Sequence, residues 1–169
     1  MIEPLDEAVD HFRGSKTEPL IVEYGDYECP YSRQAFRAIE RVDAQLGDNV
    51  RFAFRHFPLT ELHPHALAAS LAAEAAALQG GFWEMHDLLF RRQRALGDED
   101  LRGYASELRL DVARFDADRS GEVVLERVRR DVRSGDISGE VRGTPTLFVD
   151  GVVHRGGYDV PSLMEALAS

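Results

Sequence analysis

The stretch DYECPYSR at positions 26–33 joins a strand pattern to a helix pattern and holds the single cysteine of the chain, Cys29. The apolar, β-branched residues of 19–25 are typical of a buried strand. After the stretch, apolar residues recur at helical spacing over 30–46, and Gly47 ends the helix. Cys29 therefore stands where a helix leaves the end of a strand. Because a helix N-terminus carries partial positive charge, the sequence predicts a reactive, partly exposed thiolate.

Three residues after the cysteine, and on the same helix face, a dithiol redox enzyme keeps its second cysteine, but this chain has Ser32. A hydroxyl is far too weakly acidic to replace a thiolate in disulfide exchange. The Ser32 hydroxyl could instead donate a hydrogen bond to the Cys29 thiolate. The alternatives are a site that has lost its function and a serine introduced to trap an intermediate.

Two carboxylates, Asp26 and Glu28, lie next to the cysteine in sequence and oppose its ionisation. We expect both to be exposed and screened by solvent, so that the effect of the helix terminus is larger. Nearby, His63 and His65 form a His-Pro-His run in a polar loop. Two histidines, with the only cysteine placed elsewhere, are a poor ligand set, and we predict no metal site.

Length and charge limit the classes of function. The chain has 169 residues, which fits one domain over 1–169, and carries 30 acidic and 20 basic residues. These charges are interleaved without a basic stripe, which argues against nucleic acid and anionic membranes as partners. No stretch approaches 18 consecutive apolar residues, and none is expected to span a membrane. The N-terminus lacks a signal-peptide pattern, so we expect the chain as written to be cytoplasmic; a chain from which a leader had been removed would read the same way.

The remaining elements follow from periodicity and turn signals. Residues 50–57 alternate between apolar and polar, which predicts a second strand with one buried face and completes a βαβ unit. A run of helical patterns follows, and the tail returns to a hairpin around Asp150-Gly151. The predicted helices after the second strand are 66–79, one beginning at Phe82, one capped by Asp98, one capped by Asp111, one from Ser120 to about Gly135, and a terminal helix capped by Asp159.

Three features in this order resemble the DsbA-like branch of the thioredoxin superfamily. They are the Cys-Pro-Tyr-Ser tetrad at 29–32, a helical block at about 62–138, and Gly-Thr-Pro-Thr at 143–146 before the hairpin. The run FWEMHDLLF at 82–90 also looks like that branch, and the likeness covers nearly everything from Pro19 onwards. The resemblance implies an α/β thioredoxin-like fold with an inserted all-helical subdomain.

The resemblance also implies roles for residues of the site. Pro145 matches a cis proline that lies next to the active-site cysteine, and the Thr144 backbone would pair with an extended substrate. Pro30 and Tyr31 of the tetrad would contact that substrate. Glu23 matches a buried acid that handles protons beneath the cysteine. From the local residues alone, we would expect an ordinary trans proline at a strand start for Pro145. Glu23 could by the same local reasoning be a strand residue that faces solvent.

Several aromatic and histidine residues have a simpler interpretation. Phe82 and Trp83 could stack on a ligand, but packing in the helical block is the better-supported interpretation. We expect His56, His86 and His154 to be structural.

We therefore expect a thiol–disulfide oxidoreductase that acts through Cys29 alone. The thiolate would attack a disulfide of a protein, a peptide or glutathione, and an external thiol such as glutathione would resolve the mixed disulfide. Glutathione would be a co-substrate, and no cofactor is expected. The main alternative is a redox-inactive module that holds a peptide or protein. Glutathione-dependent isomerase or transferase chemistry is a more distant reading, because related enzymes carry their serine at the first tetrad position, here Cys29. The substrate, the resolving thiol and the oligomeric state are left open.

Overall fold

The computed structural model describes residues 2–14 and 18–169. Its described strands form one sheet in the order β1-β3-β2-β4-β5. Strands β2 and β3 are parallel, and β4 is antiparallel to β2. The strands are β1 (His11–Arg13), β2 (Leu20–Gly25), β3 (Arg51–His56), β4 (Thr146–Val149) and β5 (Val152–Val153).

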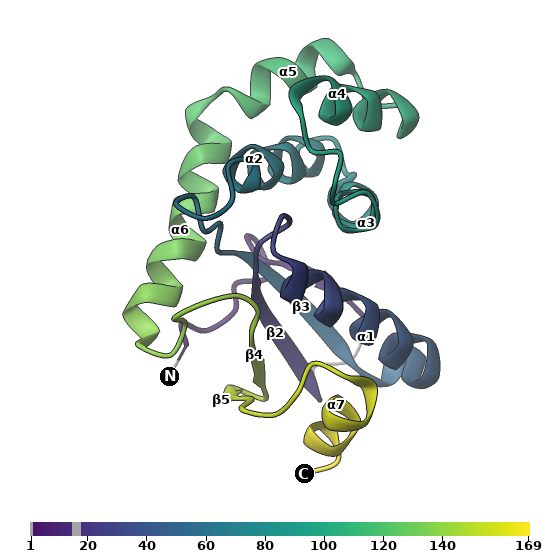
Figure 1. The fold of residues 1–169 in the computed structure, drawn as a ribbon, viewed down its shortest axis with the longest axis vertical. Helices are drawn as coiled ribbons and strands as arrows, with labels where there is room; N and C mark the ends of the chain where they lie inside the picture. The colour runs from purple at the N-terminus through teal and green to yellow at the C-terminus, as the bar shows by residue number, and fades with distance from the viewer. Residues whose placement is uncertain (1, 15–17) are drawn as a thin grey trace.

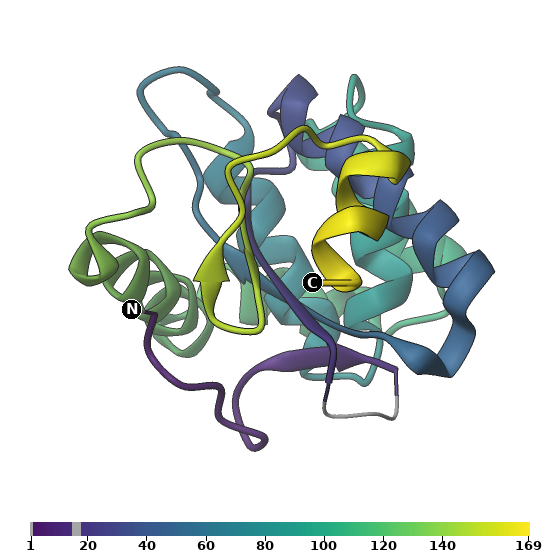
Figure 2. The ribbon, with the colours of Figure 1, turned by 90° about the horizontal axis from the view of Figure 1, so that it is seen from below.

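Helices cover both faces of this sheet and one of its ends. Figures 1 and 2 show α1 and α7 on one face, α6 on the other, and α2 to α5 gathered beyond one end of the strands. The helices are α1 (Pro30–Leu46), α2 (Ala66–Ala77), α3 (Phe82–Arg91), α4 (Asp98–Glu107), α5 (Val112–Arg119), α6 (Glu122–Ser138) and α7 (Val160–Leu167), with a short 3-10 helix η1 (Gly47–Asn49) after α1. Helices α2 to α6 thus all lie between β3 and β4 in sequence. This is the α/β thioredoxin-like arrangement with added helices that we expected.

The predicted βαβ unit is confirmed: β2, α1 and β3 follow one another, with Ile21 opposite Phe52. The predicted hairpin also forms. Asp150 and Gly151 connect β4 to β5, and both have positive φ angles, 47° and 83°. Two consecutive positive φ angles give a type I′ turn, whose twist matches that of the paired strands.

Strand β3 is buried on both faces, so the prediction of one buried face is wrong. Ala53 and Arg55, which should face solvent by alternation, are both fully buried. Helix α6 packs against this second face, and the N-terminal segment brings Asp10 over it. The Arg55 guanidinium donates to the two carboxylate oxygens of Asp10 at 2.9 and 3.0 Å and to the Tyr24 hydroxyl at 2.8 Å. An ion pair with good geometry allows this charge to be buried inside the fold.

Two helix starts differ from prediction by one residue. Gly97, not Asp98, is the N-cap of α4, and the Asp100 carboxylate accepts a hydrogen bond from the Gly97 N–H at 3.0 Å. Gly121, not Ser120, precedes α6. The predicted caps Asp111 and Asp159 are confirmed, since each side chain accepts a hydrogen bond from the backbone three residues later.

Helix α6 also continues three residues beyond the predicted end at Gly135. Gly135 therefore does not end the helix. A glycine fits at this position because of close packing. A Cβ at this position would lie 2.9 Å from the Phe57 ring and 3.2 Å from the Tyr24 ring. The missing side chain therefore lets the helix approach the sheet closely. No helix among residues 2–14 and 18–169 is long and apolar enough to cross a membrane.

Candidate active site

Cys29 is the N-cap residue of α1, immediately before the helix begins at Pro30. The Cys29 N–H donates to the Asp26 carbonyl at 3.1 Å, and the Cys29 carbonyl accepts from the Arg33 N–H at 3.1 Å. The predicted position at a helix N-terminus is therefore confirmed. The prediction of a partly exposed side chain is wrong, because Cys29 is only 3% exposed.

The Cys29 side chain is covered by a segment that lies 115 residues later in the sequence. Its thiol donates to the carbonyl oxygen of Thr144, with Sγ and O 3.4 Å apart. The Thr144–Pro145 peptide bond is cis, and Pro145 is buried while Thr144 is half-buried. The fold thus brings the tetrad and the Thr-Pro segment together. It also explains the low exposure of the sulfur, since the Thr144 backbone lies against it.

Ser32 contacts the loop rather than the sulfur. Its hydroxyl is fully buried and accepts a hydrogen bond from the Asp26 N–H at 3.2 Å. Among the contacts of the described residues, none joins this hydroxyl to Cys29, whose partner is Thr144. The hydrogen bond from Ser32 to the sulfur, one of the alternatives that the sequence left open, thus has no counterpart among the described residues. Ser32 holds the loop between β2 and α1 in place.

Asp26 is fully buried, so the expectation that it would be exposed is wrong. Its carboxylate accepts hydrogen bonds from the N–H groups of Glu28 and Leu59 at 2.8 and 2.9 Å, and lies 2.7 Å from His63 Nδ1. Glu28 in turn accepts from the His65 N–H at 2.9 Å and lies 2.8 Å from His65 Nδ1. The two histidines thus attach the 57–65 loop to the segment before the cysteine.

Sequence reasoning missed this pairing. The only available signal was the equal spacing of the two carboxylates and the two histidines, each pair being two residues apart. Within the part of the chain that the structure describes, no group of three or more His, Cys, Asp or Glu side chains could hold a metal ion.

Glu23 lies on β2, opposite Phe54 of β3 and Leu147 of β4, and is fully buried. The interpretation as a solvent-facing strand residue is therefore excluded. Neither carboxylate oxygen has a hydrogen-bond partner. Burial raises the pKa of the Glu23 carboxyl to about 8. Glu23 is thus a buried carboxyl, mostly protonated at neutral pH, on the strand that leads to Cys29.

Gln93, in the turn after α3, holds the cysteine loop from the helical side. Its amide donates to the carbonyls of Tyr27 and Cys29 at 2.9 and 2.8 Å. Both carbonyls lie in the loop that ends at the N-terminus of α1, so Gln93 fixes the backbone of the cysteine itself. Nothing local marks this residue in the sequence, because its partners are 66 and 64 positions away.

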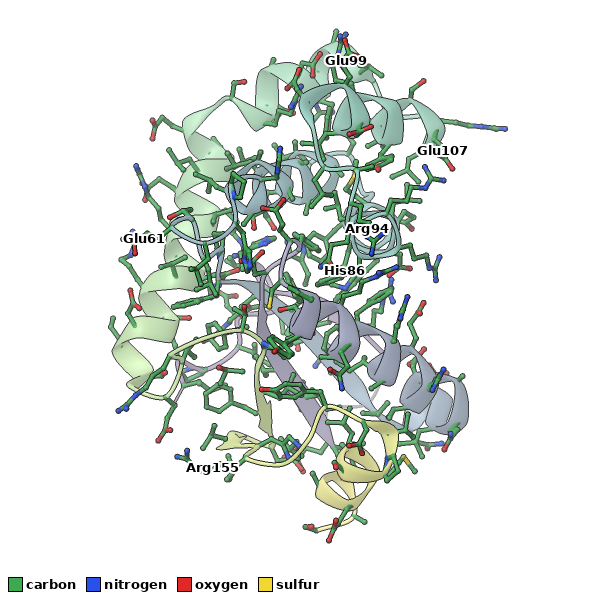
Figure 3. The ribbon with its side chains drawn as sticks, viewed as in Figure 1. Glu61, His86, Arg94, Glu99, Glu107 and Arg155 are labelled. Atoms are coloured by element: carbon green, nitrogen blue, oxygen red, sulfur yellow. The ribbon has the colours of Figure 1, made fainter. Side chains whose placement is uncertain are left out.

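Tyr27 and His86 form the buried layer next to this loop. The Tyr27 hydroxyl and His86 Nδ1 are 2.9 Å apart, and burial lowers the pKa of His86 well below its ordinary range. Figure 3 labels His86 between α3 and α1. Phe82 is 5% exposed and stacks on the His11 ring at 3.6 Å, while the Trp83 indole N–H donates to the Phe12 carbonyl.

The interpretation of Phe82 and Trp83 as packing residues is confirmed. The other histidines also have protein partners: His56 Nε2 lies 2.7 Å from Glu74, and His154 Nε2 lies 3.0 Å from the Gly157 carbonyl.

The first residues of α1 are open to solvent. Pro30 is exposed, and Tyr31 is among the most exposed large apolar side chains at 63%. These two residues follow Cys29 directly in sequence and form an exposed rim next to it.

Residues 7–168 of this chain match the family described as thioredoxin. The chain belongs to the thioredoxin family. Solved structures of similar fold include a thioredoxin-like oxidoreductase from Silicibacter pomeroyi DSS-3, with a TM-score of 0.84, 24% identity and coverage of 96% of this chain and 92% of that one. BdbD from Bacillus subtilis has a TM-score of 0.80 at 21% identity, with coverage of 96% and 93%.

The α-DsbA1 protein of Wolbachia pipientis is also similar, with a TM-score of 0.79, 17% identity and coverage of 98% and 91%. Together these structures show that this thioredoxin-family chain has the DsbA-like fold. At such low identities they show the fold alone.

Closer relatives by sequence are much longer proteins. The chain is 48% identical over 170 residues to Na(+)/H(+) antiporter NhaA 1 of Salinispora arenicola, matching 98% of this chain and 25% of the antiporter. It is 46% identical over 165 residues to NhaA of Herminiimonas arsenicoxydans, matching 97% and 26%. The chain thus spans about a quarter of these relatives, whose names describe the whole proteins.

Proposed function

We propose that this chain is a thiol–disulfide exchange protein that acts through Cys29 alone. The observation that carries the proposal is the placement of the sole cysteine at the N-terminus of α1, 3.4 Å from the Thr144 carbonyl next to a cis proline. Membership of the thioredoxin family supports it. The helix terminus favours the thiolate, which is the form that attacks a disulfide.

In the proposed reaction, the Cys29 thiol first loses its proton, and we assign its exchange with solvent to Glu23. The thiolate attacks one sulfur of a partner disulfide, a new S–S bond joins Cys29 to the partner, and the other sulfur leaves as a thiolate. Ser32 supplies no second sulfur, so release needs an external thiol. The thiolate of that molecule attacks the partner's sulfur in the mixed disulfide. The S–S bond passes to the external thiol and the partner, and Cys29 leaves as a thiolate.

Other residues of the site have assigned roles in this proposal. Because the backbone of Thr144 already lies against the sulfur, we assign it to pairing with the partner, while Pro30 and Tyr31 contact the partner on the exposed rim. Glu23 is assigned to proton exchange, since it is buried on the adjoining strand and burial raises its pKa to about 8. A partner must displace the Thr144 contact to reach the sulfur, because Cys29 is nearly covered in the free chain.

Glutathione is the external thiol that we propose, as co-substrate rather than as a resident cofactor. It is abundant in reducing compartments, and a single-cysteine protein without an internal disulfide suits such a compartment. The proposed location is accordingly the cytoplasm.

Intact mass after exposure to oxidised glutathione tests the proposal. We expect one adduct on the protein, stable after removal of free glutathione and reversed by added thiol. The Cys29→Ser variant should form none. If folded protein forms no adduct from pH 6 to pH 9, exchange chemistry is excluded. Ser32→Ala is the matched control. Because Ser32 is not the resolving group, the glutathione adduct of this variant should be as stable as that of the unaltered chain.

A second function, a redox-inactive module that binds peptides, is favoured by one observation, the low exposure of Cys29. In that case the surface around Pro30 and Thr144 would hold an extended segment without covalent capture. Peptide binding that is unchanged in Cys29→Ala, together with an unreactive sulfur in the unaltered chain, would select this alternative.

A further inference from the structure

A groove of about 750 Å³ lies directly beside the cysteine, between α1, the turn after α3 and the start of α7. Two of its lining residues are neighbours of Cys29. Pro30 follows it in sequence, and Gln93 donates its hydrogen bond to the Cys29 carbonyl at 2.8 Å. A molecule in this groove would therefore lie beside the backbone of Cys29 at the start of α1. Its volume is in the range of sites that bind small molecules or short peptide segments.

Arginines from both walls line this groove. Helix α1 contributes Arg33, Arg37 and Arg41, which are spaced four residues apart and so lie on one helix face. Arg94 comes from the turn after α3, and Figure 3 labels it above α1. The three positions on α1 span about 12 Å along the helix. The sequence-based expectation of no basic stripe is wrong on this face of α1.

These four guanidiniums have no carboxylate partner. In residues 2–14 and 18–169, none of them forms an ion pair within 4.0 Å, whereas the neighbouring Arg91 and Arg92 pair with Glu40 and Glu107. The acidic residue that lines the groove, Asp159, already accepts a hydrogen bond from the Ser162 N–H at the start of α7. With four arginines and one carboxylate, the lining of the groove has a net charge of about +3 in a chain of net charge −10.

We propose that this groove binds an extended, carboxylate-rich peptide segment of the disulfide partner, which places the partner's cysteine at Cys29. The proposal rests on the proposed exchange function and names its substrate class. Extended chain advances about 3.3 Å per residue, so three to four residues match the span of the α1 arginines. Guanidinium groups bind carboxylates with two parallel hydrogen bonds. Four guanidiniums on two walls suit several acidic side chains better than one small dicarboxylate.

The test compares two double variants of equal charge. R37Q/R41Q removes two exposed guanidiniums from the groove, and R109Q/R133Q removes two exposed ones elsewhere; both change the net charge from −10 to −12. The probes are three peptides of one length with a cysteine activated by 2-thiopyridine, flanked by three Glu, three Gln or three Lys. The readout is the second-order rate of mixed-disulfide formation, followed by release of 2-thiopyridone.

We expect the unaltered chain to capture the Glu peptide faster than the Gln peptide by a factor between about 2 and 30, the range for two exposed ion pairs. R37Q/R41Q should lose this advantage without changing the rate with the Gln peptide, and R109Q/R133Q should keep it. The Lys peptide should be the slowest. At 1 M salt the three rates should converge, because exposed charges are then screened.

The outcomes separate the groove from the exchange chemistry. Capture of all three peptides at equal rates would overturn the groove proposal and leave the exchange function standing. If no peptide is captured, the exchange function fails. The groove proposal is then tested separately, by the fluorescence anisotropy of a cysteine-free Glu peptide mixed with the Cys29→Ser protein. If the Cys29→Ser protein binds this peptide and the further substitutions R37Q/R41Q abolish binding, the groove proposal is supported. If the Cys29→Ser protein does not bind the peptide, the groove proposal is overturned. If R37Q/R41Q slows capture of oxidised glutathione as much as that of the Glu peptide, the groove recognises glutathione as well as it does the acidic peptide, and the peptide assignment is wrong.

Discussion

Replacing Glu23 by glutamine should change how the stability of the protein depends on pH. Glu23 is fully buried without a hydrogen-bond partner, and burial raises the pKa of its carboxyl from 4.5 to about 8. Between these values the unfolded chain is ionised at Glu23 while the folded chain holds the proton. Folding is therefore favoured most below pH 4.5, and this contribution is lost as the pH rises towards 8.

The magnitude follows from that interval. Each pH unit in which only the unfolded chain is ionised lowers the free energy of unfolding by about 1.4 kcal/mol, so the full loss is ~5 kcal/mol by pH 8 and ~3 kcal/mol at pH 7. Glutamine has nearly the same shape and does not ionise. Glu23→Gln should be close to the unaltered protein in stability near pH 4.5 and more stable by ~3 kcal/mol at pH 7. That difference moves a urea midpoint by about 1–3 M.

The assay measures urea unfolding by circular dichroism at a series of pH values from 4.5 to 9. Glu61→Gln is the control, since Glu61 is exposed and lies at the edge of the molecule in Figure 3. The control should follow the pH profile of the unaltered chain, so that the difference between the two glutamine variants isolates the effect of burial. If the profiles of Glu23→Gln and the unaltered chain run parallel over this whole pH range, the reasoning about the buried carboxyl is wrong.

Three further predictions concern packing, charge and chemistry. Asp10→Ala should lower the free energy of unfolding by about 3–5 kcal/mol in urea titrations, because it leaves the fully buried Arg55 guanidinium without its carboxylate; a cost below 1 kcal/mol would contradict this. Gly135→Ala should destabilise by about 1–3 kcal/mol in thermal melts, since its methyl group would lie 2.9 Å from the Phe57 ring; an unchanged melting temperature would show that the ring moves away freely. Ser32→Cys should create dithiol activity that releases captured peptide without added thiol, and a mixed disulfide that persists in this variant would refute it.

Local sequence determined the elements of the fold. The helix from Pro30 to Leu46, the turn at Asp150-Gly151 and the caps at Asp111 and Asp159 all follow from residues within a few positions of one another. Short-range periodicity, side-chain capping and backbone conformation decide such features, and each can be read from a single segment. The meeting of the tetrad with the Thr-Pro segment was predicted from the family resemblance, not from periodicity.

Tertiary structure alone decided the surroundings of the site. The cover that Thr144 places over Cys29, the two carbonyl bonds of Gln93 and the pairing of Asp26 with His63 join positions 37 to 115 residues apart. No local pattern encodes such contacts, because they depend on how helices and strands pack once they have formed. The same holds for the arginine groove. The spacing of its α1 residues can be read from the sequence, but only the packing of α7 and of the turn after α3 beside α1 makes them part of one groove.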